Sequence, residues 1–328
     1  MFAAGGIVFA WQALRAPYKG YDGEATTYEV RRGTSTAQIL RGLERRGVLR
    51  DAFVPVLYVK AIRRDLRPKA GVYEFRGALS PLDVLNRLSR GESLMIQITV
   101  REGLDRFALA KLMAEEGLGT EGEWLELTAD STLVEDIAPE ATTLEGYLFP
   151  DTYRFSPGIS PTVVVGEMVK NFRKQFGEEL AYIRTGLSVH ETVTLASIVE
   201  TEAKLEAERP LIASVYRNRI TKRMLLQADP TVIYAMKIAG TWGGNIRKDD
   251  LRMSSPYNTY ARTGLPPGPI ASPGLASLRA AANPAESEWL YFVAKNDGSH
   301  VFAKTLDEHN NNVAEWQKRY WKNRPEQR

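Results

Sequence analysis

Apolar and polar positions follow two periods along this chain, and each period predicts a different element. Alternating positions indicate short strands, whereas apolar residues three and four positions apart indicate helices with one buried face. In the N-terminal part of the chain the two patterns interleave. The predicted elements there are strands at 28–33, 71–75 and 95–100, a helix capped by Thr34 or Ser35 that runs through 43, and helices at 52–63, 80–91 and 106–116.

The C-terminal part of the chain is mostly helical, and capping residues predict several of its helix starts. Ser188 and Glu191 form a capping box, in which each side chain bonds the backbone N–H of the other residue. Proline marks further starts, because it is tolerated in the first helical turn. The predicted starts are Ser188, Glu208, Asp229, Ser272 and Thr305, with an aromatic, turn-rich stretch at 144–153, a proline-rich loop at 265–269 and a hairpin with strands at 290–294 and 301–304.

These elements predict an α+β fold in two folded parts behind a short N-terminal segment. A small α+β module would occupy residues 21–98, and a mainly helical region with one β-hairpin would occupy residues 99–328. The length of 328 residues agrees with this division, since a domain has about 150 residues. Residues 1–20 would form an apolar segment and a linker.

The N-terminal residues 2–14 are uncharged and mostly apolar, and Arg15 follows them. This run is shorter than the roughly 20 apolar residues that cross a bilayer. It is either the incomplete start of a membrane anchor, with Trp11 and Arg15 at the interface, or a short buried segment. We favour the anchor, because residues 16–20 resemble a linker beside a membrane.

A carboxylate at the end of an apolar helix is the strongest candidate for chemistry. Glu200 ends a run that is apolar on most sides, and burial there would favour the protonated form that a general acid needs. At about 100° per residue, Glu202 lies nearly opposite Glu200 and also among apolar residues, so the pattern alone does not choose the acid. The alternative is structural: each glutamate pairs with a buried arginine such as Arg209 or Arg217.

The composition narrows the chemistry. The chain has no cysteine, and its histidines, His190, His300 and His309, are scattered, so we expect no disulfide, no zinc or haem site and no cofactor. The net charge is only +3, yet residues 31–70 hold eleven Lys and Arg against three acidic residues. This stretch is either a solvated basic face or a surface that attracts an anionic partner.

Amide, hydroxyl and aromatic side chains gather in the sequence among loops and helix starts. Such groups suit a sugar, which needs hydrogen bonds and stacking faces, but they also suit any surface loop. No Ser-His-Asp order with a nucleophile elbow, no P-loop and no dinucleotide-binding fingerprint occurs in the sequence. The candidates are Glu145, Asn218, Gln227, Asp229, Tyr257, Asn258 and Tyr260.

Five segments in fixed order and spacing carry a more specific signal. They are Ala-Ser-Ile-Val-Glu at 196–200, Leu-Gln-Ala-Asp-Pro-Thr-Val-Ile-Tyr at 226–234, Ser-Pro-Tyr-Asn-Thr-Tyr at 255–260, Gly-Leu-Pro-Pro-Gly-Pro-Ile at 264–270 and Tyr-Phe-Val-Ala at 291–294. Together they resemble the YceG-like (MltG) family of endolytic murein transglycosylases over most of the chain from Glu145 onward. Residues 28–33 also resemble, more weakly, the opening of a LysM-like module.

The resemblance implies an enzyme that cuts the MurNAc–GlcNAc bond within peptidoglycan strands, leaves 1,6-anhydro-MurNAc ends and thereby ends the elongation of new strands. The family's catalytic glutamate falls on Glu200. Neither a metal nor a cofactor is implied. The residues that we expect to bind the substrate are Glu202, Asn218, Gln227, Asp229, Tyr257, Asn258 and Tyr260.

The resemblance also implies a place and partners for the protein. The family has a full transmembrane helix, of which this chain holds only a part, so we expect a single-pass protein of the cytoplasmic (inner) membrane with its catalytic region on the extracytoplasmic side. Glycan strands and peptidoglycan synthases are the expected partners. A glycan-binding or scaffold module that works through residues 31–70 is the rival class. A nucleic-acid-binding protein ranks below it, because aromatic residues are not interleaved there in the way that a base-stacking platform requires.

Overall fold

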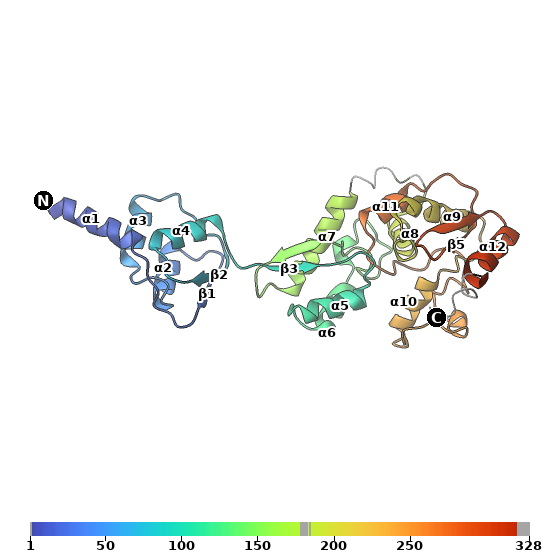
Figure 1. The fold of residues 1–328 in the computed structure, drawn as a ribbon, viewed down its shortest axis with the longest axis horizontal. Coiled ribbons are helices and arrows are strands. Elements are labelled where there is room, and N and C mark those ends of the chain that lie inside the picture. Colours follow the sequence, from blue (N-terminus) through green and yellow to red (C-terminus); the bar gives the residue numbers. More distant parts are fainter. Residues whose placement is uncertain (1, 178–182, 184, 320–328) are drawn as a thin grey trace. The chain divides into compact units, whose positions relative to one another are not determined.

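A computed structural model describes residues 2–177, 183 and 185–319 of the chain (Figure 1). The fold is a mixture of helices and small sheets, in agreement with the predicted α+β class. It divides into two compact units, Met1–Gln97 with Arg154–Ile159, and Ile98–Tyr153 with Ser160–Arg328. Each unit is considered by itself.

The first unit is built on an antiparallel pair of strands, β1 (Ala25–Val30) and β2 (Gly71–Arg76), in which Tyr28 lies opposite Tyr73. β1 begins and ends three residues before the predicted strand, because the chain turns at Gly33, which has a φ of 81°. Helices pack an apolar core against the pair, and Tyr73 and Phe75 are fully buried in it. The helices that contribute to this core are α2 (Thr36–Arg45), α3 (Phe53–Ala61) and α4 (Pro81–Arg90).

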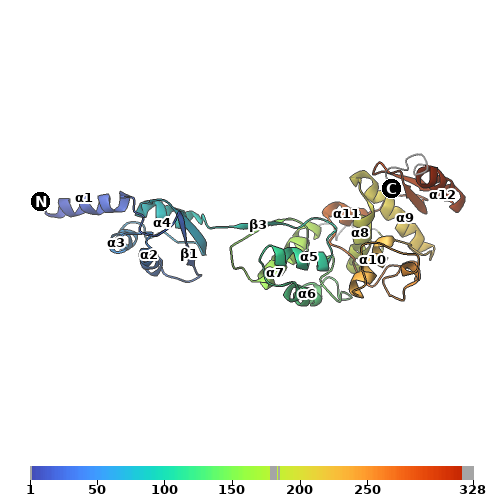
Figure 2. The ribbon, with the colours of Figure 1, turned by 60° about the horizontal axis from the view of Figure 1, so that its bottom comes forward.

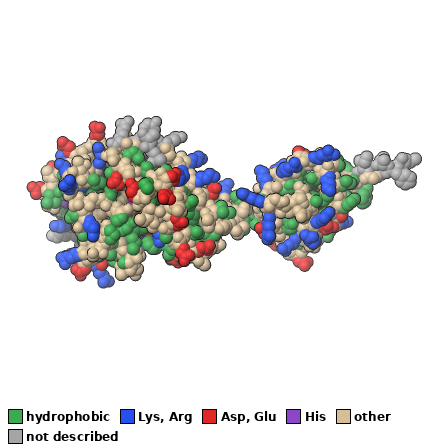
Figure 3. All heavy atoms as spheres, turned by 180° about the vertical axis from the view of Figure 1, so that it is seen from behind, with side chains coloured by type: hydrophobic (Ala, Val, Ile, Leu, Met, Phe, Trp, Pro, Cys, Tyr) green, Lys and Arg blue, Asp and Glu red, His purple; other side chains and the backbone are tan. Residues whose placement is uncertain are grey.

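The basic stretch of this unit lies at its surface. Ten of the eleven Lys and Arg side chains between residues 31 and 70 are exposed, and Arg63 is half-buried. Figure 3 shows Lys and Arg spread over the visible face of the unit. The charges are therefore available to a partner, although a solvated face would look the same. The LysM-like assignment of this unit stays a prediction.

The N-terminal run forms α1 (Phe2–Arg15), a helix of 14 residues that packs against α3 and α4. Leu14 is buried, whereas Val8, Phe9 and Trp11 are exposed, Phe9 by 69%. Among the helices that the structure describes, none combines the length and the apolar character needed to cross a bilayer. Membrane attachment through this segment therefore stays a prediction.

The second unit is mostly helical and gathers around α8 (Val189–Glu202) (Figure 2). Every side chain of α8 from Thr192 to Val199 is buried, and α9, α10 and α11 all contact the helix. The unit's other elements are α5 (Arg106–Glu115), α6 (Glu121–Ala129), α7 (Pro161–Phe176), α9 (Arg209–Thr221), α10 (Asp229–Ile238), α11 (Leu275–Ala282), the hairpin strands β5 (Tyr291–Ala294) and β6 (His300–Ala303), and α12 (Leu306–Val313). β3 (Ile96–Thr99) pairs with β4 (Thr152–Phe155) in a separate two-stranded sheet.

Side chains cap two of the predicted helix starts in the second unit. Ser188 caps α8 and Thr305 caps α12, each in a complete capping box with a glutamate three residues on. α10 begins at Asp229 as predicted, whereas α11 begins after Gly274, two residues beyond the predicted start at Ser272. Helices α6 and α7 were not predicted individually. α7 nevertheless carries the cue of Ser160 followed by Pro161.

The proline-rich loop at 265–269 docks on α8, and the absence of a side chain at Gly146 makes room for it. The Nε2–H of His190 donates to the Pro267 carbonyl at 2.8 Å, and its Nδ1 is hydrogen-bonded to the Tyr147 hydroxyl, also at 2.8 Å. The Ile270 N–H donates to the Ser197 hydroxyl at 3.0 Å. This side of the loop is thereby fixed to the central helix.

Replacement of Gly146 should therefore loosen the centre of the second unit. Gly146 has a φ of 84°, and a Cβ there would lie 2.5 Å from Pro269 Cβ. Gly146→Ala adds steric overlap to the backbone strain, for a total loss of about 2–4 kcal/mol in the free energy of unfolding. Gly117→Ala is the matched control, because Gly117 has a φ of 75° and open space around it. Equal losses for the two variants in guanidinium unfolding would contradict the close packing.

Candidate active site

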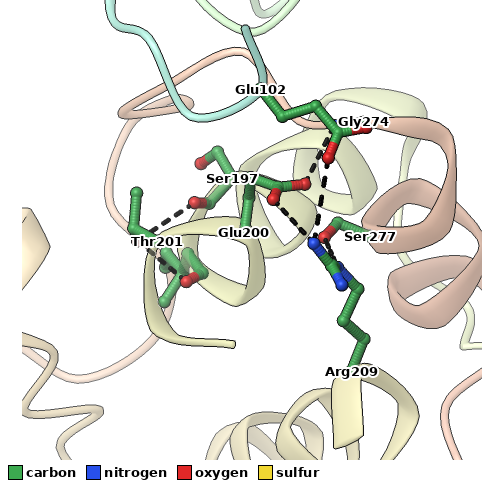
Figure 4. A network of polar contacts seen from close by, with 8 residues as sticks. Glu102, Ser197, Glu200, Thr201, Arg209, Gly274 and Ser277 are labelled. Atoms are coloured by element: carbon green, nitrogen blue, oxygen red, sulfur yellow. Dashed lines mark hydrogen bonds and ion pairs between the residues drawn. The ribbon is translucent and has the colours of Figure 1, made fainter. Parts of the chain in front are cut away.

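Glu200 lies near the end of α8 with its carboxylate held by two donors (Figure 4). The Nη2 atom of Arg209 donates to Oε1 at 2.9 Å, and the Gly274 N–H donates to Oε2 at 3.0 Å. Only 6% of the Glu200 side chain is exposed. Each carboxylate oxygen thus has its own donor, as a buried charge requires.

Arg209 is itself held in place. It is the first residue of α9, with Pro210 next to it, and it follows a short 3-10 turn at Glu206–Glu208. Its Nε donates to the Ser277 hydroxyl on α11 at 2.9 Å, inside the protein. Arg209 therefore ties α8, α9 and α11 together at the carboxylate.

This geometry corrects one expectation about Glu200. Its helix is apolar and buried as predicted, but its carboxylate contacts an arginine and a backbone N–H rather than apolar groups. The sequence alternative of a buried arginine partner is thus realised, and the partner is Arg209. The ion pair and a role in chemistry do not exclude each other, because a substrate approaching Glu200 would meet a fixed carboxyl group.

A second carboxylate, Glu102, stands beside this pair and was missed by sequence reasoning. Its Oε2 lies 3.9 Å from the Arg209 Nη2, and 51% of its side chain is exposed. Burial, and then the charge of Glu200, raise the pKa of Glu102, while Arg209 opposes them. The only sequence signal was its place in a glycine turn directly after a strand, which is common to many loops.

Glu202 points to other partners, as its position nearly opposite Glu200 on the helix predicted. The Tyr216 hydroxyl donates to Glu202 Oε1 at 3.2 Å, and burial raises the pKa of Glu202 to about 7. Glu202 lines a cavity of about 390 Å³ that also receives Arg219, Phe292 and His300.

Three more of the predicted substrate-binding residues line the same cavity, namely Gln227, Asp229 and Tyr260. The Tyr260 hydroxyl donates to Asp229 Oδ1 at 2.5 Å. Gln227 has a φ of 53°, a strained backbone conformation for a residue other than glycine. The cavity thus collects carboxylates, an amide and phenol rings, which suit the hydroxyls and faces of a sugar.

The remaining three predicted residues have structural partners instead. The Asn218 amide donates to the carbonyls of Ser287 and Trp289, and the Asn258 amide donates to those of Leu251 and Met253. Tyr257 packs against Tyr234, with its ring centroid 5.0 Å away. The structure does not bring these three residues to the cavity lined by Glu202.

Tyr257 belongs to a cluster around Glu145, a buried residue whose carboxyl group lies against the first residue of α5. The Arg106 N–H donates to Glu145 Oε2 at 2.9 Å. Burial nevertheless raises the pKa of Glu145 to about 8, and the charge of Asp105 adds to the effect. Glu145 is therefore protonated near neutral pH in the folded protein, with no open path that would make it a catalytic acid.

No group of three or more His, Asp and Glu side chains suited to a metal ion occurs within the part of the chain that the structure describes. The chemistry on offer is thus that of carboxyl groups, an arginine and backbone N–H groups. A carboxyl held beside a solvent-accessible partner can give and accept a proton.

Comparison with known proteins gives one consistent result. The model of the YceG-like family matches residues 28–315. A protein of Bacillus subtilis (strain 168) named endolytic murein transglycosylase is 34% identical over 325 residues, which cover 93% of this chain and 89% of that protein. A protein of the same name from Streptococcus pneumoniae serotype 2 (strain D39 / NCTC 7466) is 30% identical over 352 residues, with 96% of this chain covered.

The lengths of these relatives differ. The alignment spans only 63% of the streptococcal protein. Among solved structures, a crystal structure of a YceG-like protein from Listeria monocytogenes is similar with a TM-score of 0.58 and 34% identity. That similarity covers 88% of this chain and 99% of the Listeria chain.

The buried Glu145 should make the stability of the fold depend on pH. Between its ordinary pKa of 4.5 and the folded value of about 8, the folded state keeps a proton that the unfolded state has lost. Stability is therefore lost as pH rises through this window. The amide of Glu145→Gln is neutral at every pH. From pH 5 to pH 8 the free energy of unfolding of this variant should therefore rise relative to that of the wild type, by on the order of 3 kcal/mol.

Denaturant unfolding across this pH range measures the effect, with Glu140→Gln at an exposed carboxylate as the control. The Glu140→Gln curve should stay parallel to that of the wild type. A constant difference between Glu145→Gln and the wild type at every pH would show that Glu145 keeps its ordinary titration.

Proposed function

The chain belongs to the YceG-like family, and from this membership we propose that it is an endolytic murein transglycosylase that cuts MurNAc–GlcNAc bonds within peptidoglycan strands. The observation that supports this most directly is the fixed carboxyl of Glu200, the residue to which the sequence resemblance assigns the catalytic role. Peptidoglycan is thus the proposed substrate, and no cofactor enters the reaction.

A single carboxyl can serve both steps of this reaction. Glu200, holding a proton, donates it to the glycosidic oxygen as the bond from MurNAc C1 to that oxygen breaks. The C6 hydroxyl of the same MurNAc then attacks C1, and the Glu200 carboxylate accepts the hydroxyl proton. The product is a 1,6-anhydro end, no water is consumed, and Glu200 is protonated again. Hydrolytic glycosidases usually use two carboxyl groups, because besides the acid they need a second group that activates water or acts as the nucleophile.

The neighbours of Glu200 have defined parts in these steps. Arg209 and the Gly274 N–H fix the carboxyl group and stabilise the carboxylate left after the first proton transfer. Arg209 begins α9, and Gly274 is the N-cap residue of α11. The carboxyl group of Glu200 is therefore held by groups outside α8 as well as by its own side-chain rotamer.

The cavity on the other side of α8 is a candidate for binding sugar units. Glu202, Gln227 and Asp229 offer acceptors and an amide to sugar hydroxyls, and Tyr260 offers a ring. Asn218 and Asn258, by contrast, would support the substrate region by holding neighbouring loops. Tyr257 would act through packing, at the edge of the Glu145 cluster.

Glu202 remains the rival acid within the same function. Its pKa of about 7 suits proton donation at neutral pH, and it lines an open cavity. Loss of the residue that acts as the acid should abolish cleavage, whereas loss of the other glutamate should only weaken it.

Paired substitutions separate the two glutamates. Glu200→Gln keeps the size of the side chain and one acceptor oxygen but cannot donate the proton, so the release of anhydro-MurNAc ends should fall by at least about 100-fold. The release should fall much less in Glu202→Gln, because the amide oxygen can still accept a hydrogen bond from the Tyr216 hydroxyl. Mass spectrometry of uncrosslinked glycan strands after incubation measures the ends. The reverse order of effects, in variants that remain folded, would move the acid to Glu202.

The setting of the activity follows from the same proposal. Attachment to the cytoplasmic (inner) membrane through residues 2–15 and a catalytic region on the extracytoplasmic side would place the enzyme next to peptidoglycan synthases. Cuts made there within new strands would end their elongation. The rival, a glycan-binding module that uses the basic face of residues 31–70, predicts capture of glycan strands without any new anhydro ends.

A further inference from the structure

We propose that Glu102 is a positioning residue of the Glu200 site, and that the two carboxyl groups share one proton beside Arg209. This inference rests on the proposed function and deepens it. It answers a difficulty in the geometry: an acid must hold a proton, whereas Arg209 and the Gly274 N–H both stabilise the charged form of Glu200. A second negative charge nearby offsets that stabilisation.

The three groups converge on one guanidinium nitrogen. Arg209 Nη2 lies 2.9 Å from Glu200 Oε1 and 3.9 Å from Glu102 Oε2 (Figure 4). Glu102 also lies against the backbone of Gly274. A Cβ on Gly274 would be only 1.8 Å from the Oε1 atom of Glu102. Gly274 therefore contacts both carboxylates, donating its N–H to Glu200 and leaving room for Glu102.

The position of Glu102 is built into the fold rather than left to a flexible turn. Gly103 has a φ of 78°, and its N–H donates to the Ser272 carbonyl at 2.9 Å. The Ser272 N–H donates back to the Leu104 carbonyl at 2.7 Å. This exchange of backbone bonds holds the residue before Gly103 next to the chain that leads to Gly274.

The charges around Glu102 favour one shared proton. Two carboxylates face a single guanidinium, so full ionisation would leave one negative charge without a partner. The neighbouring Glu206 adds a further negative charge, and Arg209 supplies the opposing positive one. The raised pKa of Glu102 agrees with this balance. We therefore treat the proton as belonging to the pair rather than to either residue.

The two carboxyl groups differ in their exposure to solvent, and this difference gives them different roles. Glu102 is half-exposed and can exchange protons with water, whereas Glu200 is nearly enclosed and has fixed donors. Glu200 finishes each turnover protonated, so Glu102 need not deliver a proton to each bond that is cut. Its charge instead acts on Glu200 through the guanidinium of Arg209 that both carboxyl groups face, while the substrate contacts Glu200 alone.

The pH profile of kcat/KM on uncrosslinked glycan strands tests this role. Glu102→Gln keeps the shape of the side chain but removes its charge, so the pair should lose its proton at a lower pH. The basic limb of the profile should move down by about one pH unit, with near wild-type activity at pH 5.5 and about a tenfold loss at pH 8. Glu102→Asp, which keeps the charge, should restore most of the basic limb.

Two further variants guard against a merely structural effect. Gly274→Ala keeps the N–H and an ordinary φ of −75°, yet its Cβ must displace the tip of Glu102, so it should move the basic limb in the same direction. Glu126→Gln removes an exposed carboxylate of the same unit and should leave the profile unchanged.

The possible outcomes distinguish this inference from the proposed function. An active wild type in which Glu102→Gln lowers kcat/KM equally at every pH, or does not change it, overturns the shared proton while the proposed function stands. A wild type that releases no anhydro ends overturns the proposed function. A basic limb that moves down in Glu102→Gln and returns in Glu102→Asp supports the inference.

Discussion

A carboxylate buried at the end of α8 must be paired, and that requirement organises the centre of the second unit. Glu200 has its guanidinium partner on α9 and its N–H donor just before α11, so three helices must meet with correct register. Breaking such a buried pair by removing one partner leaves a charge without compensation, at a cost of about 3–5 kcal/mol. The Ser277 hydroxyl, which accepts from Arg209, extends this constraint into the core.

The same helix carries two glutamates whose surroundings set them apart. Glu200 meets an arginine and a backbone N–H, whereas Glu202 meets a tyrosine hydroxyl and a cavity, and burial raises its pKa to about 7. Two residues only two positions apart thus acquire different chemistry because they leave the helix on nearly opposite sides. The angular position around α8 determines the side on which each glutamate lies, but the elements that pack on that side decide the chemistry of each carboxyl group.

Glycines let the loops come close enough to complete the site. Gly146 admits the loop at 265–269 onto α8, and Gly274 admits Glu102. The bonds from His190 and Ser197 to that loop hold it on the buried helix. The loops are therefore fixed by the same rigid element that carries Glu200, which keeps the carboxyl and its donors in a constant geometry.

The sequence by itself determined the α+β character, the capped start of α8, the hairpin and the burial of the helix that bears Glu200, because capping and periodicity are local. It also supplied the family's segments, which single out Glu200 where periodicity could not. Only the tertiary structure decided that Arg209 rather than Arg217 pairs with Glu200, that Asn218 and Asn258 bond backbone carbonyls, and that Glu102 joins the site. These contacts join residues far apart along the chain, and Glu102 and Glu200 are 98 positions apart. Their partners are set by how helices and loops pack, which no local pattern records.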